Sequence, residues 1–338
     1  MNALAPYLET FLREYLPRDR RVSPHTAETY AYAFQLLVCF AAERLKTAPS
    51  SIHIEQLDAP LILQFLDHIE TQRHNLPQTR NARLGAVKAL FRFLEYRLPS
   101  SLDQVCRIKA IPIKKTDEKV IDYLTHDEMQ VLLDAPDPCT RVGIRDRAML
   151  HLAFAAGLRV SELVGLQREE LTLYPHPSVH VRGKGRRERD LPLWKETLVA
   201  LRAWLAVRGE NAAPELFLNA NGQPLTRSGF EYVLEKHVAT ATQKQPSLAS
   251  KRISPHVLRH SCAMHTLLAT HDIRKVSLWL GHATLQSTEI YLRADPTEKL
   301  EALAAVLPPM LRRGRFKAPD KLLAMLKSAK TASRYTER

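Results

Sequence analysis

The stretch SPHVLRH at residues 254–260 is the centre of the part of this chain that carries chemistry. From Ser254 onward the residue pattern is helical, so Arg259 lies on a predicted helix. Downstream, residues 280–282 read LGH, and Tyr291 follows nine residues after His282. This region therefore combines a guanidinium, several imidazoles and a phenol.

Two upstream segments add further cations. Residues 157–163 read GLRVSEL, which places Arg159 between the glycine that ends a long helix and a new helix with Ser161 as its expected N-cap. Residues 182–189 read RGKGRRER. Because residues 178–193 alternate in polarity around a glycine-rich turn, they predict a β-hairpin with Lys184 at its tip.

These residue types suit the cleavage of a phosphodiester. A tyrosine such as Tyr291 can attack phosphorus and remain covalently attached to it. Arg159 and Arg259 are always charged and bind phosphate with a fixed fork, so they can stabilise the charge that grows on the non-bridging oxygens. Lys184, on a glycine-flanked tip, can protonate the leaving 5′ oxygen.

The histidines have several possible roles. His256 and His282 can position the phosphate and move the proton of the tyrosine. His256 and His260 are four residues apart, as in some zinc sites, but Val257 stands where a zinc protease carries Glu. We therefore expect no metal and no other cofactor, since the two arginines can neutralise the phosphate. His260 is expected to pack or to bond locally, like His265.

Together these segments resemble the tyrosine recombinases, also called the phage integrase family. The resemblance rests on a GLRxSEL arginine box, a GKGxxxR hairpin, HxLRH, LGH and a closing tyrosine, with His282 placed 23 residues after Arg259. It covers most of residues 123–295, and the N-terminal part is more weakly similar to the core-binding domain of the family. The resemblance implies that the catalytic residues are Arg159, Lys184, His256, Arg259, His282 and Tyr291.

The resemblance also implies a reaction and an assembly. The chain is expected to be a site-specific recombinase that cuts and rejoins double-stranded DNA through a 3′-phosphotyrosine. Four copies would bring two recombination sites together as a homotetramer, either alone or with another recombinase. We favour integration and excision, or transposition, of a mobile element over the resolution of replicon dimers.

Two other functions stay open. A type IB topoisomerase uses similar chemistry to relax DNA, although the compact N-terminal part and the recombinase-like spacing argue against it. A DNA-binding accessory protein could keep the fold and lack the chemistry, but all six catalytic residue types are present. Product topology separates recombination, which needs two specific sites, from relaxation, which needs none.

Composition agrees with a nucleic-acid partner. The 338 residues include 49 Lys and Arg against 36 Asp and Glu, which gives a net charge of +13 and indicates a polyanionic partner. Residues 311–338 hold nine basic and two acidic residues, so this tail supplies over half of the surplus. The four cysteines are scattered and no apolar run is long enough to span a membrane, so we expect a cytoplasmic protein.

The pattern along the chain predicts a fold that is mainly α with a small β-sheet or hairpin. A bundle of amphipathic helices is expected over residues 1–108, with helices near residues 3–16, from Ser23-Pro24, from Asp58 to Arg73 and from about Thr79 to Tyr96. Residues 109–122 form the expected linker to a mixed α/β catalytic domain over residues 123–310. In the basic tail at 311–338, the stretch from Lys321 to Lys330 could form a short helix, and residues 297–330 could pack on the next protomer.

Six further cations are candidate DNA contacts. Three of them lie on the expected polar side of the fourth helix, where they either bind phosphates or form a solvated face; they are Arg80, Arg83 and Lys88. The other three flank the hairpin lysine, and they are Arg182, Arg186 and Arg187. The sequence does not indicate which bases such contacts would read.

Overall fold

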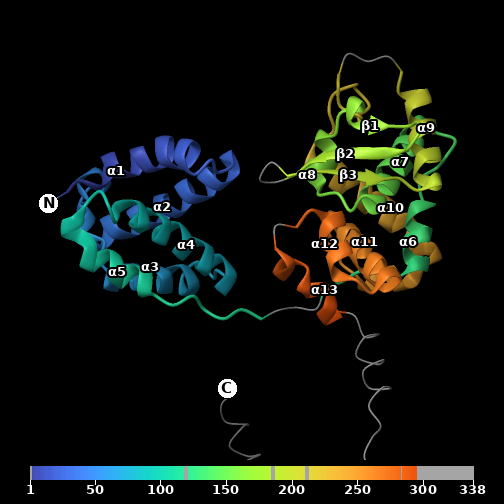
Figure 1. The fold of residues 1–338 in the computed structure, drawn as a ribbon. Coiled ribbons are helices and arrows are strands. Elements are labelled where there is room, and N and C mark those ends of the chain that lie inside the picture. Colours follow the sequence, from blue (N-terminus) through green and yellow to red (C-terminus); the bar gives the residue numbers. More distant parts are fainter. Residues whose placement is uncertain (1, 118–120, 184–186, 210–212, 283, 295–338) are drawn as a thin grey trace, which may run out of the picture. The chain divides into compact units, whose positions relative to one another are not determined.

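The computed structural model describes residues 2–117, 121–183, 187–209, 213–282 and 284–294. The chain divides into two compact units, residues 1–119 and 120–338, and each is considered by itself (Figure 1). The division falls inside the stretch predicted as a linker. None of the helices within the described ranges combines the length and the hydrophobicity needed to cross a bilayer.

The N-terminal unit is helical throughout (Figure 1). Its α-helices are α1 (Leu4–Thr10), α2 (Pro24–Leu45), α3 (Ala59–Thr71), α4 (Pro77–Leu94) and α5 (Leu102–Ala110). A π-helical segment, Phe11–Asp19, extends α1, and short 3₁₀ turns lie at Pro49–Ser51, Ile54–Gln56 and Pro99–Ser101.

The predicted starts of two helices are confirmed by their caps. The Ser23 hydroxyl accepts a hydrogen bond from the backbone N–H of Thr26 at 3.3 Å, and an Asp58 oxygen accepts one from the N–H of Leu61 at 2.8 Å. Such caps satisfy backbone donors that the first turn leaves free. The apolar stripes of α2, α3 and α4 meet in one core, which includes the buried rings of Phe11, Phe34, Phe65, Phe91 and Phe93.

Two features of this unit differ from the prediction. The first helix does not end near residue 16 but continues to Asp19 in a wider π-helical turn, where Pro17 has no N–H for an α-helical hydrogen bond. Helix α5 was not predicted, so the linker begins at Ile111 rather than at residue 109. Its nine residues bury only Val105 and Ile108, and a helix this short depends on packing against the bundle for its stability.

The start of the linker is bound to α4, and this changes the interpretation of two predicted DNA contacts. Arg80 is only 4% exposed, and its Nη1 donates to the carbonyl of Pro112 at 3.0 Å. Lys88 Nζ donates to the carbonyl of Ile111 at 2.5 Å. Arg80 therefore lies inside the unit rather than on a polar face. Arg83 is half-buried and donates to the carbonyl of Thr29 at 3.3 Å. Its contact with phosphate stays a prediction.

The C-terminal unit combines helices with one small sheet (Figure 1). Its α-helices are α6 (His126–Leu133), α7 (Arg141–Ala155), α8 (Val160–Gly165), α9 (Lys195–Arg208), α10 (Arg227–Lys244), α11 (Pro255–Thr270), α12 (Ile273–Leu280) and α13 (Glu289–Ala294). Its strands are β1 (Leu171–Thr172), β2 (Ser178–Arg182) and β3 (Glu188–Pro192). Single 3₁₀ turns lie at Arg168–Glu170, Pro246–Ser250 and Leu285–Ser287.

The predicted hairpin is confirmed as β2 and β3, which pair antiparallel with Val179 opposite Leu191 and Val181 opposite Arg189. Val179, Val181 and Leu191 face the core, as the alternation of the strands requires. The two-residue strand β1 was not predicted and adds to the other edge of β2. The hairpin is therefore anchored to the core through one face of its strands.

Helix α7 is the centre of the larger core, and most of its side chains are buried. It packs against α9 on one side and α11 on another. A second cluster holds Met264 of α11, Leu280 of α12 and Tyr291 of α13. The helices that carry the sequence motifs are thus packed against one another, which brings distant segments to one place.

Candidate active site

Arg259 ties together three segments that are far apart in the sequence. It lies on α11, is 4% exposed, and donates to the carbonyl of Gly157 at 2.5 Å and to that of Leu280 at 2.7 Å. Gly157 has a φ of +55°, and a Cβ there would lie 2.7 Å from Leu280 Cδ2, so glycine is required. The guanidinium of Arg259 is therefore fixed by backbone groups.

Glu162 of α8 is the carboxylate around which the arginines gather. It accepts hydrogen bonds from the backbone N–H of Arg159 at 3.0 Å, from Arg159 Nη1 at 2.8 Å and from Arg189 Nη2 at 2.8 Å. Arg259 Nη1 lies 4.0 Å from the same carboxylate. The expectation of Ser161 as N-cap is wrong: Arg159 is the N-cap residue, because Glu162 reaches back to its N–H.

Arg189 of β3 is a site residue that the sequence reasoning did not single out. Its buried guanidinium pairs with Glu162, and a Cβ at Gly281 would lie 3.1 Å from its Cδ. A Cβ at Gly183 would lie 3.3 Å from Glu162 Oε1, so the residue before Lys184 borders the arginine cluster. The sequence did contain a signal for this residue, because Arg189 is the last residue of the basic segment RGKGRRER.

The cluster carries an excess of positive charge. Three guanidiniums, those of Arg159, Arg189 and Arg259, surround the single carboxylate of Glu162 and leave a surplus of two charges. Burial, and then the charge of Arg159, lower the pKa of Arg259 to about 10, so it stays charged at neutral pH. Burial raises the pKa of Glu162, but hydrogen bonds from Arg189 and Arg159 outweigh it and hold that pKa below 4.5. The cluster is therefore suited to an anion.

Tyr291 lies beside this cluster and is 1% exposed. Its hydroxyl lies 3.0 Å from Nδ1 of His260, and its ring is parallel to that of His282 at a centroid distance of 6.4 Å. Burial raises the pKa of Tyr291 to about 12, although Arg259 and Arg159 favour its charged form. The expectation that His260 only packs or bonds locally is therefore wrong, because its bond is made to the proposed nucleophile.

His282 is held by its own neighbours. Its Nδ1 lies 2.8 Å from the hydroxyl of Thr288, and Arg187 Nη1 donates to its backbone carbonyl at 3.0 Å. Burial, followed by the charge of Arg259, lowers the pKa of His282 to about 4. The imidazole is therefore neutral at neutral pH, and the foot of the hairpin is attached to the LGH segment.

Of the remaining predicted site residues, some are exposed and others lie outside the described residues. His256 is exposed in the first turn of α11. Arg182 is exposed and pairs with Glu170 at 3.3 Å. Lys184 and Arg186 lie outside the described residues. The structure thus brings Arg159, Arg259, His282 and Tyr291 together.

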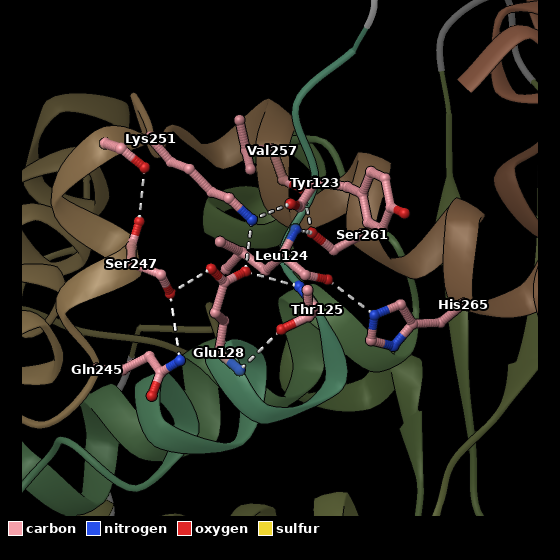
Figure 2. A network of polar contacts seen from close by, with 11 residues as sticks. Tyr123, Leu124, Thr125, Glu128, Gln245, Ser247, Lys251, Val257, Ser261 and His265 are labelled. Carbon is pink, nitrogen blue, oxygen red and sulfur yellow. Dashed lines mark hydrogen bonds and ion pairs between the residues drawn. The ribbon is translucent and has the colours of Figure 1, made fainter. Parts of the chain in front are cut away.

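Helix α11 also takes part in a polar network through Ser261 and His265 (Figure 2). The backbone N–H of Leu124 donates to the Ser261 hydroxyl at 2.8 Å, and His265 Nε2 donates to the Leu124 carbonyl at 2.9 Å. The buried carboxylate of Glu128 accepts from Lys251 Nζ at 2.6 Å. Since burying such groups is stabilising only when they are paired, this network fixes the end of the linker against α11.

Chemically, the site can bind an anionic phosphate and present a phenol to it. The arginine cluster supplies a fixed positive field, and the Tyr291 phenol is an oxygen group that could act as a nucleophile there. Within the described ranges, no group of three or more His, Cys, Asp or Glu side chains is arranged to hold a metal ion. The arginines, the histidines and Tyr291 are groups suited to acid–base and nucleophilic chemistry.

Known proteins are similar to this chain in both sequence and fold. The profile of the phage integrase family matches residues 122–298, and that of the phage integrase N-terminal SAM-like domain matches residues 8–97. The Sinorhizobium fredii protein y4rC, which carries the name integrase/recombinase, is 40% identical, and the match covers 96% of this chain and 98% of y4rC. Tyrosine recombinase XerC of Myxococcus xanthus is 33% identical over 86% of this chain and 94% of its own.

Two solved structures have the same fold. XerH site-specific recombinase in a post-cleavage complex with palindromic difH substrate has a TM-score of 0.65 and 22% identity, covering 87% of this chain and 83% of XerH. The Tn1549 transposon integrase in complex with circular intermediate DNA has a TM-score of 0.66 and 17% identity, covering 90% of this chain and all of that chain. With the family profiles and the arginine–tyrosine site, these matches establish that the chain belongs to the phage integrase family, the tyrosine site-specific recombinases.

Proposed function

We propose that this enzyme cuts and rejoins double-stranded DNA at specific sites through a 3′-phosphotyrosine on Tyr291. The observation that carries the proposal is the burial of the Tyr291 phenol beside an arginine cluster that holds a surplus of two positive charges. A phenol with a pKa of about 12 is a poor nucleophile in water. Next to a bound phosphodiester, the same arginines would stabilise the developing charge.

The proposed cleavage step assigns a role to each group. Tyr291 Oη attacks phosphorus, the bond to the 5′ oxygen breaks, and Lys184 protonates that oxygen. Arg159 and Arg259 bind the two non-bridging oxygens, with His256 and His282 next to the phosphate. Rejoining is the reverse reaction, in which a 5′ hydroxyl attacks the phosphotyrosine, so the bond energy is conserved.

Affinity for DNA would come mainly from contacts to phosphates. The exposed guanidiniums of Arg182 and Arg187 lie at the base of the hairpin tip, and we include Arg186 and Arg83 in the same role. Such contacts release counterions and make binding fall steeply with salt. The net charge of the whole chain, +13, supports this assignment.

We further propose that the enzyme serves a mobile element and acts as a homotetramer that pairs two sites. The 40% identity with y4rC over 96% of the chain, against 33% with XerC over 86%, supports integration and excision or transposition over dimer resolution. The segment proposed to pack on the next protomer, 297–330, lies outside the described residues. Deleting residues 321–338 should impair recombination before it impairs binding to a single site.

The experiment is a covalent-trapping assay. Nicked suicide substrates from the DNA that surrounds the gene are incubated with the enzyme without metal or ATP, and adducts that resist denaturant are resolved on a gel. We expect an adduct with the native enzyme and with Tyr232→Phe, whose tyrosine is 69% exposed on α10, and none with Tyr291→Phe. An adduct that persists in Tyr291→Phe contradicts the assignment of the nucleophile, and specific binding without any adduct indicates an accessory protein.

A further inference from the structure

We propose that His260 positions the hydroxyl of Tyr291 and accepts its proton when the DNA strand is cut. This role rests on the proposed cleavage by Tyr291, and it assigns to His260 the proton transfer that the sequence suggested for His256 and His282. It makes His260 a catalytic residue in its own right, because its ring nitrogen contacts the reacting oxygen.

The geometry of the two histidine rings separates their roles. His260 Nδ1 lies 3.0 Å from Tyr291 Oη, and the two ring planes meet at 62°. An imidazole nitrogen accepts a proton in the plane of its ring, and Nδ1 is the His260 atom within hydrogen-bond distance of the phenol. His282 lies parallel to Tyr291, at 7°, with Nδ1 engaged by the Thr288 hydroxyl at 2.8 Å. His282 therefore presents a ring face to the phenol and His260 presents a lone pair.

The charge state of His260 fits an acceptor. Burial, followed by the charges of His256 and Arg259, lowers the pKa of His260 to about 4, so the imidazole is neutral at neutral pH. The proposed role requires the tautomer with the proton on Nε2, in which Nδ1 can accept. The ionisable groups around it are His256 and Arg259 on its own helix, Tyr291 on α13 and His282 before it. A phenol with a pKa of about 12 is ionised in roughly one molecule in 10⁵ at pH 7. Cleavage at neutral pH thus needs a group that removes the proton.

A bound phosphodiester would assist the transfer. Its negative charge would offset the guanidinium of Arg259, which contributes to the low pKa of His260. The phenol also becomes more acidic as its oxygen bonds to phosphorus. Proton transfer is therefore expected to accompany attack rather than to precede it.

Bonds and protons balance in the proposed cleavage step. The Oη–H bond of Tyr291 breaks, its proton moves to His260 Nδ1, and an oxygen lone pair forms the O–P bond. The P–O5′ bond breaks with its electron pair, and the 5′ oxygen takes a proton from Lys184. In rejoining, the 5′ hydroxyl forms the O5′–P bond and gives its proton back to Lys184, and the protonated His260 returns a proton to Tyr291 Oη as the phosphotyrosine bond breaks. Neither direction consumes an oxidant, a reductant or a nucleotide.

The test compares two asparagine substitutions on α11. In His260→Asn the amide oxygen can still accept a hydrogen bond from Tyr291 but cannot take its proton. His265→Asn is the matched control, because His265 is also half-buried on α11 but donates to the backbone of Leu124. Single-turnover adduct formation on the nicked substrate is measured from pH 6 to pH 9.

We expect a nearly flat profile between pH 6 and pH 8 for the native enzyme and for His265→Asn. His260→Asn should form adduct about 10²–10⁴-fold more slowly at pH 7. Its rate should rise about tenfold per pH unit, because cleavage would then depend on the ionised fraction of Tyr291. A role of His260 in packing alone would lower the rate without producing this slope.

An adduct from His260→Asn with the native pH profile overturns the proposal, whatever its absolute rate. A faster rate with an unchanged slope also overturns it, since the hydrogen bond would then restrain Tyr291 instead of activating it. If native enzyme forms no adduct, the proposed cleavage fails and the role of His260 falls with it, which is a distinct outcome.

A second measurement does not depend on folding of the asparagine variant. In the DNA-free protein, the ¹⁵N signal of His260 Nδ1 should be that of a hydrogen-bonded, unprotonated nitrogen. It should move toward the value of a free unprotonated nitrogen in Tyr291→Phe, which loses only the hydroxyl. An Nδ1 that carries a proton at neutral pH, or a signal that does not move, overturns the proposal.

Discussion

Replacing Glu162 with Gln tests whether one buried carboxylate holds the arginine cluster. The change keeps the size of the side chain and removes the charge that faces Arg159, Arg189 and Arg259. Removing one partner of a buried ion pair costs about 3–5 kcal/mol, and Glu162 pairs directly with two arginines. We take the lower end, about 3 kcal/mol, because the side chain of Arg159 is 30% exposed.

Tryptophan fluorescence reports the unfolding of the C-terminal unit, which contains Glu162, because all three tryptophans lie in that unit: Trp194, Trp204 and Trp279. A loss of about 3 kcal/mol should lower the melting temperature of a unit of this size by about 6–12 °C. The folded protein holds the pKa of Glu162 below 4.5, so its stabilisation is complete above that pH and is lost as the pH falls through the folded value. The stability gap between native enzyme and Glu162→Gln should therefore narrow below about pH 4.5.

Glu128→Gln is the matched control. Glu128 is also a buried N3 carboxylate that closes a capping box and accepts from a cation, Lys251, at 2.6 Å. Both variants should lose stability, but at a temperature where both are folded only Glu162→Gln should lose adduct formation, by about 10²-fold or more, because Arg159 and Arg189 lose their anchor. Equal adduct formation by the two variants would refute the inference that Glu162 orients the arginines.

Three further predictions follow from the packing. Gly157→Ala should lower the free energy of unfolding in urea by about 2–4 kcal/mol, because an added Cβ meets Leu280 at 2.7 Å at a φ of +55°. Gly165→Ala, where a Cβ meets nothing within 4 Å, should leave it unchanged, and equal losses in the two variants would contradict the prediction. At Asp146, burial raises the pKa but hydrogen bonds from His237 and Arg145 outweigh it and keep the pKa below 3.8. Its stabilisation is thus lost as the pH falls below that value, and the stability gap between native enzyme and Asp146→Asn should shrink from pH 7 to pH 3; a constant gap would argue against the ion pair. Arg80→Ala should speed proteolysis within residues 112–117, because the hydrogen bond to Pro112 is lost. It should leave the salt dependence of DNA binding unchanged, and a weaker salt dependence in this variant would instead indicate that Arg80 contacts a phosphate.

Local signals in the sequence were sufficient for much of the fold. Ser23 and Asp58 were predicted to begin helices, and each caps one in the structure, because capping depends on residues within one turn. The β2–β3 hairpin followed from alternation around a glycine turn. Helix α5 escaped prediction because it buries few side chains and depends on packing against residues far along the chain.

For the site, the sequence by itself determined which residue types were available and in which order, from Arg159 to Tyr291. Only the tertiary structure decided how they meet. Arg259 reaches Gly157 and Leu280 across more than twenty residues in each direction, and His260 reaches Tyr291 across 31. Periodicity and capping report contacts within a turn or a hairpin, whereas these bonds depend on how α8, α11, α12 and α13 pack. For the same reason the burial of Arg80, which a helical pattern placed on a polar face, was decided by the linker that covers it.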